Sequence, residues 1–285
     1  MIRPWDNKYS AKERYLAAFG RFFLNIFNLG IFYGTTTKFL GSGVAKIEQE
    51  WQHTTKEAFA SPDYNEFFEK NPIFSDETLR TGLCAAFAKA STRLSTQAVE
   101  SATLIFAHTI LDETLSECCR ISFMASPKDW LQFVSERKVK LGEVKSIKAI
   151  SQKKTWEYVF ELQRESINQR FDILHRVCAP RLDGAKLPTA WISREKLERF
   201  DQLRHRVIHG RRFLRKTPQI EDQIQFAKQS GFSTLILVVQ AYGLLKNKKV
   251  LPRNSSLLRL LVVARQEFPE LVELLDTMVK SRTEE

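Results

Sequence analysis

The sequence predicts an all-α protein, and two observations lead to that prediction. Helix-capping and helix-ending residues recur along most of the 285-residue chain, whereas strict alternation of apolar and polar residues bounded by hairpin turns is absent. The composition, 43% apolar and 27% charged, is that of a folded protein and excludes the collagen-like, disordered and coiled-coil classes. We therefore expect a helical bundle with further helices at both ends.

The first helix is expected to begin with a capping box. Ser10 is followed by Glu13 at the spacing that lets each side chain accept a hydrogen bond from the other residue's backbone N–H. Gly30 and the Gly-Ser-Gly turn at 41–43 are expected to break the helical run that follows. Short helices separated by proline-containing turns are expected over 44–94.

An apolar, aromatic-rich stretch lies within this region, at residues 22–34. It has 13 residues and contains two asparagines, whereas a bilayer span takes about 20 apolar residues. We interpret it as a buried or interfacial helix, with attachment to a membrane surface as the alternative, and we expect no firm membrane association.

The start of the chain and its cysteines indicate a cytoplasmic protein. Residues 1–7 lead into a charged stretch and not into the apolar run of a secretory signal. The four cysteines form no Cys-x-x-Cys pair, so neither a disulfide framework nor a zinc knuckle is indicated. Reduced thiols are the expectation.

Longer helices are predicted further along the chain. Residues 97–124, rich in Ala, Leu, Ile and Cys, predict a mostly buried helix, and apolar residues at helical spacing predict an amphipathic helix over 155–178. Ser193 is expected to cap a helix that ends at Gly210. A strongly apolar helix is predicted over 217–245.

These elements suggest three segments. Residues 1–94 are predicted to form an N-terminal helical layer, residues 95–248 a helical core, and residues 249–285 a pair of C-terminal helices.

The charge distribution points to a polyanionic partner. The chain has 44 basic and 33 acidic residues, a formal net charge of +11, and nucleic acid is the first candidate. Residues 204–216 contain no acidic side chain and hold His205 and His209. The basic side chains of this cluster are Arg204, Arg206, Arg211, Arg212, Arg215 and Lys216. They predict a phosphate-binding surface, and the alternative is an ordinary basic helix end.

The stretch LERFDQLRHRVIHG, residues 197–210, resembles the signature helix of HEPN domains, in which an Arg is followed after four to six residues by a His. Arg204 and His209 occupy these two positions, and an Ile-His-Gly ending follows. His205 stands where many members of the family carry Asn. Two other pairs with matching spacing, Arg170 with His175 and Arg199 with His205, are interpreted as structural.

The resemblance implies a HEPN-like helical bundle over roughly 95–248. It also implies a metal-independent endoribonuclease without a cofactor, a homodimer in which both motifs line one cleft, and a role as a toxin or antiviral defence effector. RNA is then the substrate, and an antitoxin or regulatory protein is a further expected partner. The alternative is a non-catalytic HEPN-like module that binds RNA or a protein.

The chemistry of such a pair follows from its side chains. Removing the proton of a ribose 2′-OH and protonating the departing 5′ oxygen suits a histidine, here His209. The planar guanidinium of Arg204 suits the non-bridging phosphate oxygens. Five residues along a helix correspond to about 140° of rotation, so the two groups can converge only at a helix end or across an interface.

Other groups are candidates for a supporting role beside His205. Asp112 and Glu113 fall in the predicted buried helix, and Arg204 is a candidate partner for one of them. Pairing of Asp112 with His108, and exposure of Glu113 and Glu117 to water, are the alternatives. A zinc site is not expected, because Arg206 stands where an H-E-x-x-H site needs Glu.

Overall fold

The protein is all-α, as predicted. The computed structural model is 93% helical and contains no strand in the part of the chain that it describes. The described residues are 10–62, 65–72, 76–133, 155–182, 192–209 and 220–244. The predicted C-terminal helices over 249–285 lie outside them.

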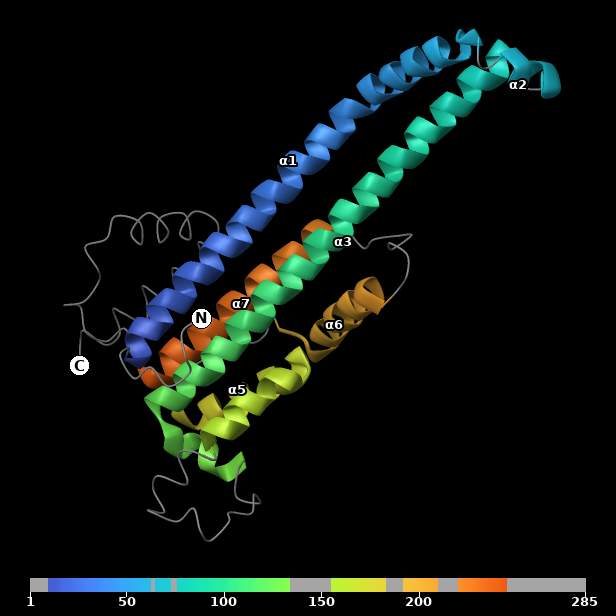
Figure 1. Cartoon of the computed structure of the whole chain (residues 1–285). Helices are drawn as coiled ribbons and strands as arrows, with labels where there is room; N and C mark the ends of the chain where they lie inside the picture. Colours follow the sequence, from blue (N-terminus) through green and yellow to red (C-terminus); the bar gives the residue numbers. More distant parts are fainter. Residues whose placement is uncertain are drawn as a thin grey trace, which may run out of the picture. The chain divides into compact units, whose positions relative to one another are not determined.

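Six of the described α-helices are labelled in Figure 1. The α-helices are α1 (Ala11–Phe59), α2 (Asn65–Lys70), α3 (Glu77–Ala125), α5 (Ile167–Cys178), α6 (Arg194–His209) and α7 (Ile220–Tyr242). Short 3-10 helices are η3 (Pro127–Phe133), η5 (Leu162–Arg164) and η6 (Ala179–Arg181). Residues 155–161 are also α-helical.

The chain divides into two compact units, each built from separate segments. Unit 1 comprises Met1–Phe27, His108–Asp201 and Gln225–Glu285, and unit 2 comprises Asn28–Ala107 and Gln202–Ile224. These units do not coincide with the three consecutive segments expected from the sequence.

The core of unit 1 joins the first part of α1 to α7. The rings of Phe19 and Phe23 lie 6.0 and 5.8 Å from the ring of Phe232, and all three side chains are buried. Gly231 has no Cβ that would collide with the buried ring of Phe22. Contact between aromatic side chains and a glycine therefore brings the two helices close together.

The second part of α3 holds α5 and the start of α6 within the same unit. From α5, the buried Arg170 donates to the hydroxyl of Ser116, at 2.7 Å. On α6, the ring of Phe200 packs 5.5 Å from that of His108 and 5.5 Å from that of Phe226 on α7. Polar and aromatic contacts thus fix both helices.

Unit 2 contains a helical hairpin. Residues 28–59 of α1 and residues 77–107 of α3 run in opposite directions, with α2 at the turn (Figure 1). The rings of Trp51 and Phe87 stack across it, with their centroids 6.4 Å apart. Many of the described side chains of these two helix segments are exposed.

Several sequence predictions about helix ends are confirmed. Glu13 accepts from the backbone N–H of Ser10 at 2.7 Å, and the hydroxyl of Ser10 accepts from that of Glu13 at 3.2 Å, so the capping box is present. Ser193 caps α6 by accepting from the backbone N–H of Lys196 at 3.0 Å. The buried helix predicted over 97–124 lies inside α3.

Three other predictions about helix limits are wrong. The helix does not break at Gly30 or at 41–43, because α1 continues to Phe59. Each internal glycine costs roughly 1 kcal/mol relative to alanine, a cost that tertiary packing can offset. Long helices, and not only short ones, cover 44–94. The helix predicted over 155–178 is interrupted after residue 161, and a capping box at Ser166 starts α5.

The continuity of α1 also lengthens the apolar stretch. Among the described helices, the segment Ala11–Gly43 is long and apolar enough to cross a membrane, and 39% of its most apolar window is buried. The core helix of a soluble protein can have the same composition. The apolar stretch inferred from the sequence, with 13 residues, was too short because the glycines do not end the helix.

Candidate functional site

The end of α6 carries the Arg204–His209 motif, and the helix has two distinct sides. Leu197, Phe200 and Leu203 are buried. They are three residues apart, about one helical turn, and therefore form one packed side of the helix. The remaining positions of the last two turns carry mostly basic and imidazole side chains. The amphipathic pattern therefore holds the helix by one side and leaves the motif near its C-terminal end.

Two imidazoles lie together at this end. His205 and His209 are both exposed, and their ring centroids are 4.2 Å apart with an interplanar angle of 43°. One helical turn separates them, which places them on the same side of α6. Arg206 is exposed beside them. The pair is open to a solvent-borne ligand.

Arg204 occupies a different environment. Its side chain is half-buried, and its Nε is buried without a hydrogen-bond partner among the residues that the structure describes. Burying a guanidinium donor without an acceptor is unfavourable.

The rest of the predicted phosphate-binding cluster falls outside the described residues. This holds for Arg211, Arg212, Arg215 and Lys216, and also for the predicted stop at Gly210. The described part of the cluster therefore consists of Arg204, Arg206 and the two histidines.

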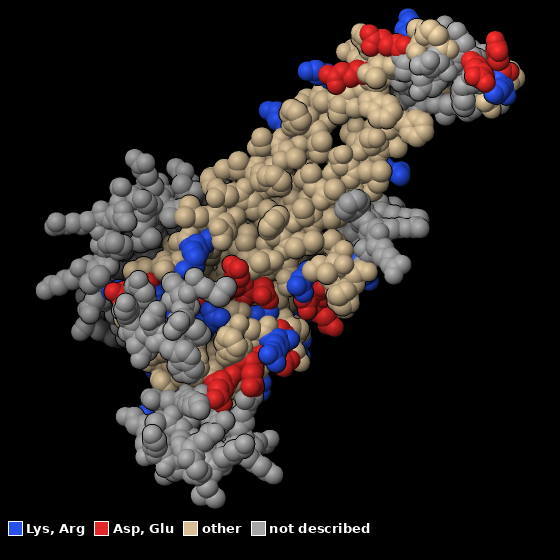
Figure 2. Space-filling model, in the orientation of Figure 1, with Lys and Arg blue, Asp and Glu red and all other residues tan. Residues whose placement is uncertain are grey.

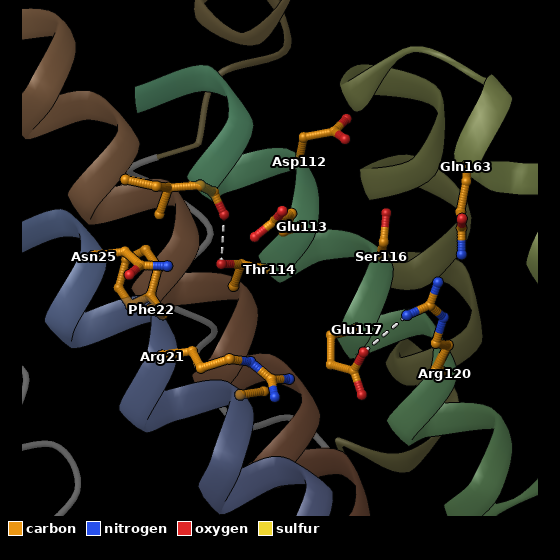
Figure 3. Close-up of a pocket in the computed structure, with 12 residues that line it drawn as sticks. Arg21, Phe22, Asn25, Asp112, Glu113, Thr114, Ser116, Glu117, Arg120 and Gln163 are labelled. Carbon is orange, nitrogen blue, oxygen red and sulfur yellow. Dashed lines mark hydrogen bonds and ion pairs between the residues drawn. The ribbon is translucent and has the colours of Figure 1, made fainter. Parts of the chain in front are cut away.

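Asp112 and Glu113 line a pocket in unit 1 (Figure 3). The pocket has a volume of about 450 Å³ and lies between the first part of α1, the second part of α3 and Gln163. Arg21 and Asn25 enter it from α1. Most of its lining side chains are polar, and they carry both signs of charge.

The structure assigns a different partner to Asp112 from those expected. Asp112 forms an ion pair with Arg170. His108, which was one of the two partners considered for Asp112, instead bonds to Asp201: its Nε2 lies 2.8 Å from Asp201 Oδ1. Glu113 is exposed, as in the alternative interpretation, whereas Glu117 is half-buried and pairs with Arg120 at 3.0 Å. Arg170 is 2% exposed, which agrees with its structural interpretation.

Sequence reasoning missed two pairings, His108 with Asp201 and Arg170 with Asp112. One signal was available for Arg170, since it lies at helical spacing among Ile167, Phe171 and Leu174 on the packed side of α5. A charged residue on such a side requires a buried partner. No comparable signal identifies Asp201 as the partner of His108.

In the described part of the chain, no group of three or more His, Cys, Asp or Glu side chains is placed to hold a metal ion. Comparisons with protein-family models, curated proteins and solved structures find no match to the chain. The resemblance to HEPN domains therefore rests on residues 197–210 and on the chemistry of the side chains there.

Proposed function

We propose that the protein is a metal-independent endoribonuclease of HEPN type that acts in the cytoplasm as a toxin or antiviral defence effector. The observation that carries the proposal is the exposed pair His205 and His209, whose ring centroids are 4.2 Å apart. Arg204 directly precedes His205 in the sequence. A motif that served only packing would be expected to bury its histidine, whereas His209 is exposed.

The side chains divide the reaction between them. His209 takes the proton of the ribose 2′-OH, whose oxygen then attacks the phosphorus. A second imidazole, from the other copy of the motif, gives a proton to the departing 5′ oxygen. Arg204, whose side chain is half-buried, holds the non-bridging oxygens through its guanidinium. The products are a 2′,3′-cyclic phosphate and a 5′-hydroxyl end.

A homodimer completes the site in this proposal. Arg204 and His209 are separated by about 140° around α6, so one helix presents them in different directions. A second copy of the motif supplies the complementary groups, and an antitoxin or regulatory protein would act by covering them. Arg206 and the basic residues after His209 hold the RNA backbone.

The test is cleavage of a fluorescently labelled RNA in the presence of EDTA, with the product ends identified by mass. We expect His209→Ala and Arg204→Ala to lower the cleavage rate by roughly a hundredfold or more. Arg199→Ala, an exposed position on the same helix, and His53→Ala, on α1, are matched controls that keep the activity.

Other outcomes would reject the catalytic proposal. A requirement for magnesium, or products with 3′-hydroxyl ends, excludes this mechanism. Absence of cleavage combined with RNA binding that persists in His209→Ala would favour a non-catalytic RNA-binding module, which the histidine at position 205 also suggests.

A further inference from the structure

The hairpin of unit 2 exposes many large apolar side chains. Among the described residues, eight of the thirteen exposed large hydrophobic side chains lie on its two helices. The eight are Ile31, Phe32, Phe39 and Trp51 on α1 and Leu79, Phe87, Leu94 and Phe106 on α3. Scattered exposed apolar residues are common, but a concentration of this kind marks an interaction surface.

On α1, three of these four side chains lie on one side of the helix, and Trp51 lies on the other. Positions 31, 32 and 39 fall within about 100° of one another at 100° per residue, and the side chains there are 52%, 48% and 72% exposed. We call these three residues the α1 apolar face. Leu29 and Tyr33, about 60° and 100° further around the helix from Phe32, are buried. The helix is therefore apolar on its exposed and its buried side, a property of core helices and of helices in contact with lipid.

The charge around this face is basic. Over residues 28–47 and 81–107, the exposed charged side chains are Lys38, Lys46, Lys89 and Arg93, and the exposed carboxylate nearest to Lys46 among the described side chains further along α1 is Glu50. The acidic residue in these ranges is Glu100, which is half-buried. Figure 2 shows a mostly uncharged surface along the middle of the hairpin with isolated basic groups, and both acidic and basic groups at its far end. Apolar side chains edged by cations match an anionic lipid surface.

We propose that the α1 apolar face binds the surface of a bilayer that contains anionic phospholipid. Ile31, Phe32 and Phe39 enter the boundary between headgroups and acyl chains, while Lys38 and Lys46 reach the lipid phosphates. The proposal is independent of the ribonuclease activity.

The charged side chains also favour a lipid surface over a second copy of the chain as the binding partner of the α1 apolar face. Lys38 and Lys46 lie on the same side of α1 as the apolar face. In a two-fold pair with parallel α1 helices these cations would meet their own copies, and in an antiparallel pair centred on Phe39 Lys46 would meet the apolar Phe32. A lipid surface instead offers phosphates to both lysines.

The experiment is sedimentation of the full-length protein with vesicles of phosphatidylcholine alone and with vesicles that also contain phosphatidylglycerol. We expect binding to the second kind, weakened by added salt. The triple variant Ile31→Ser/Phe32→Ser/Phe39→Ser should lower the partition coefficient by roughly tenfold or more. Leu131→Ser/Phe160→Ser, which changes exposed apolar side chains of unit 1, is the matched control and should bind like the parent.

A second variant guards against loss of folding. Lys38→Glu/Lys46→Glu keeps the apolar side chains and should remove the preference for phosphatidylglycerol, with helix content checked by circular dichroism. His209→Ala should bind vesicles like the parent. Failure of the parent to sediment with anionic vesicles overturns the proposal. So does a triple variant that binds unchanged, or one whose only effect is to convert a dimer to a monomer.

Discussion

At Gly231, the missing side chain decides how closely α1 and α7 pack. An added Cβ would lie 2.3 Å from Cε2 and 2.7 Å from Cζ of Phe22, whose ring is 3% exposed. We expect Gly231→Ala to lower the free energy of unfolding by about 1–3 kcal/mol, because the ring has to move within a packed core. Urea unfolding measures this change.

Gly30 provides the matched control, since an added Cβ there meets nothing within 4 Å and the position is helical. Gly30→Ala should raise the free energy of unfolding by up to about 1 kcal/mol through helix propensity. Equal stabilities for the two variants would show that contact with Phe22 does not constrain position 231.

The buried thiols make stability depend on alkaline pH. Burial raises the pKa of Cys119 from 9.0 to about 12, and burial also raises the pKa values of Cys118 and Cys178. Above pH 9.0 the unfolded chain loses these protons while the folded chain keeps them. The free energy of unfolding should therefore be unaffected by these thiols below pH 9.0 and fall above it, by up to about 1.4 kcal/mol per pH unit for each thiol. Urea unfolding over this pH range tests the slope, which Cys119→Ala should reduce.

At the scale of elements, one bond between α3 and α6 positions the helix that carries the motif. His108 is 3% exposed, and its Nε2 lies 2.8 Å from Asp201 Oδ1, one turn before His205. Asp201→Ala leaves the buried imidazole without this acceptor, so we expect a loss of about 1–3 kcal/mol in the free energy of unfolding.

Glu198→Ala serves as the control for Asp201→Ala, because position 198 is exposed on the same helix. Its effect should stay within about 0.5 kcal/mol. If both variants unfold at the same urea concentration, the bond between His108 and Asp201 does not hold α6.

Helix starts were predictable from the sequence, whereas helix continuity was not. A capping box such as Ser10 with Glu13 depends on neighbours within one turn, so local sequence is sufficient to identify it. The passage of α1 through Gly30 depends on distant packing partners, which no local pattern contains. The same reason explains why Asp112 was not matched with Arg170, 58 residues further along the chain.

The candidate site was partly predictable for a related reason. Arg204, His205 and His209 belong to one helix, and their grouping follows from spacing alone. Whether His209 is exposed depends on what packs against α6, and the sequence left that open.

For the whole molecule, the interleaving of the two units has a consequence for folding. Residues 1–27 belong to the same compact unit as the second part of α3, α5 and most of α7. The sequence predicted a core formed by residues 95–248 alone, with residues 1–94 as a separate layer. The first part of that layer, residues 1–27, instead belongs to the same compact unit as most of the predicted core.

Removal of residues 1–94 should accordingly prevent the remaining chain from folding. The deletion takes five large buried side chains out of unit 1: Tyr15, Phe19, Phe22, Phe23 and Ile26. Each contributes roughly 1.5–3 kcal/mol by burial. Their combined contribution is comparable to the entire stability of a typical domain, about 5–15 kcal/mol. We expect the fragment 95–285 to be insoluble or to lack a cooperative thermal transition and near-ultraviolet circular dichroism.

Co-expression of two fragments shows whether folding fails because these side chains are missing or because the chain has been cut. Fragments 1–60 and 61–285, divided between α1 and α2, together retain every segment of unit 1. On co-expression they should copurify and unfold cooperatively, because Phe19 and Phe23 can still reach Phe232. A fragment 95–285 that unfolds cooperatively by itself would instead show that residues 95–248 form the independent core expected from the sequence, with α1 packed on its surface.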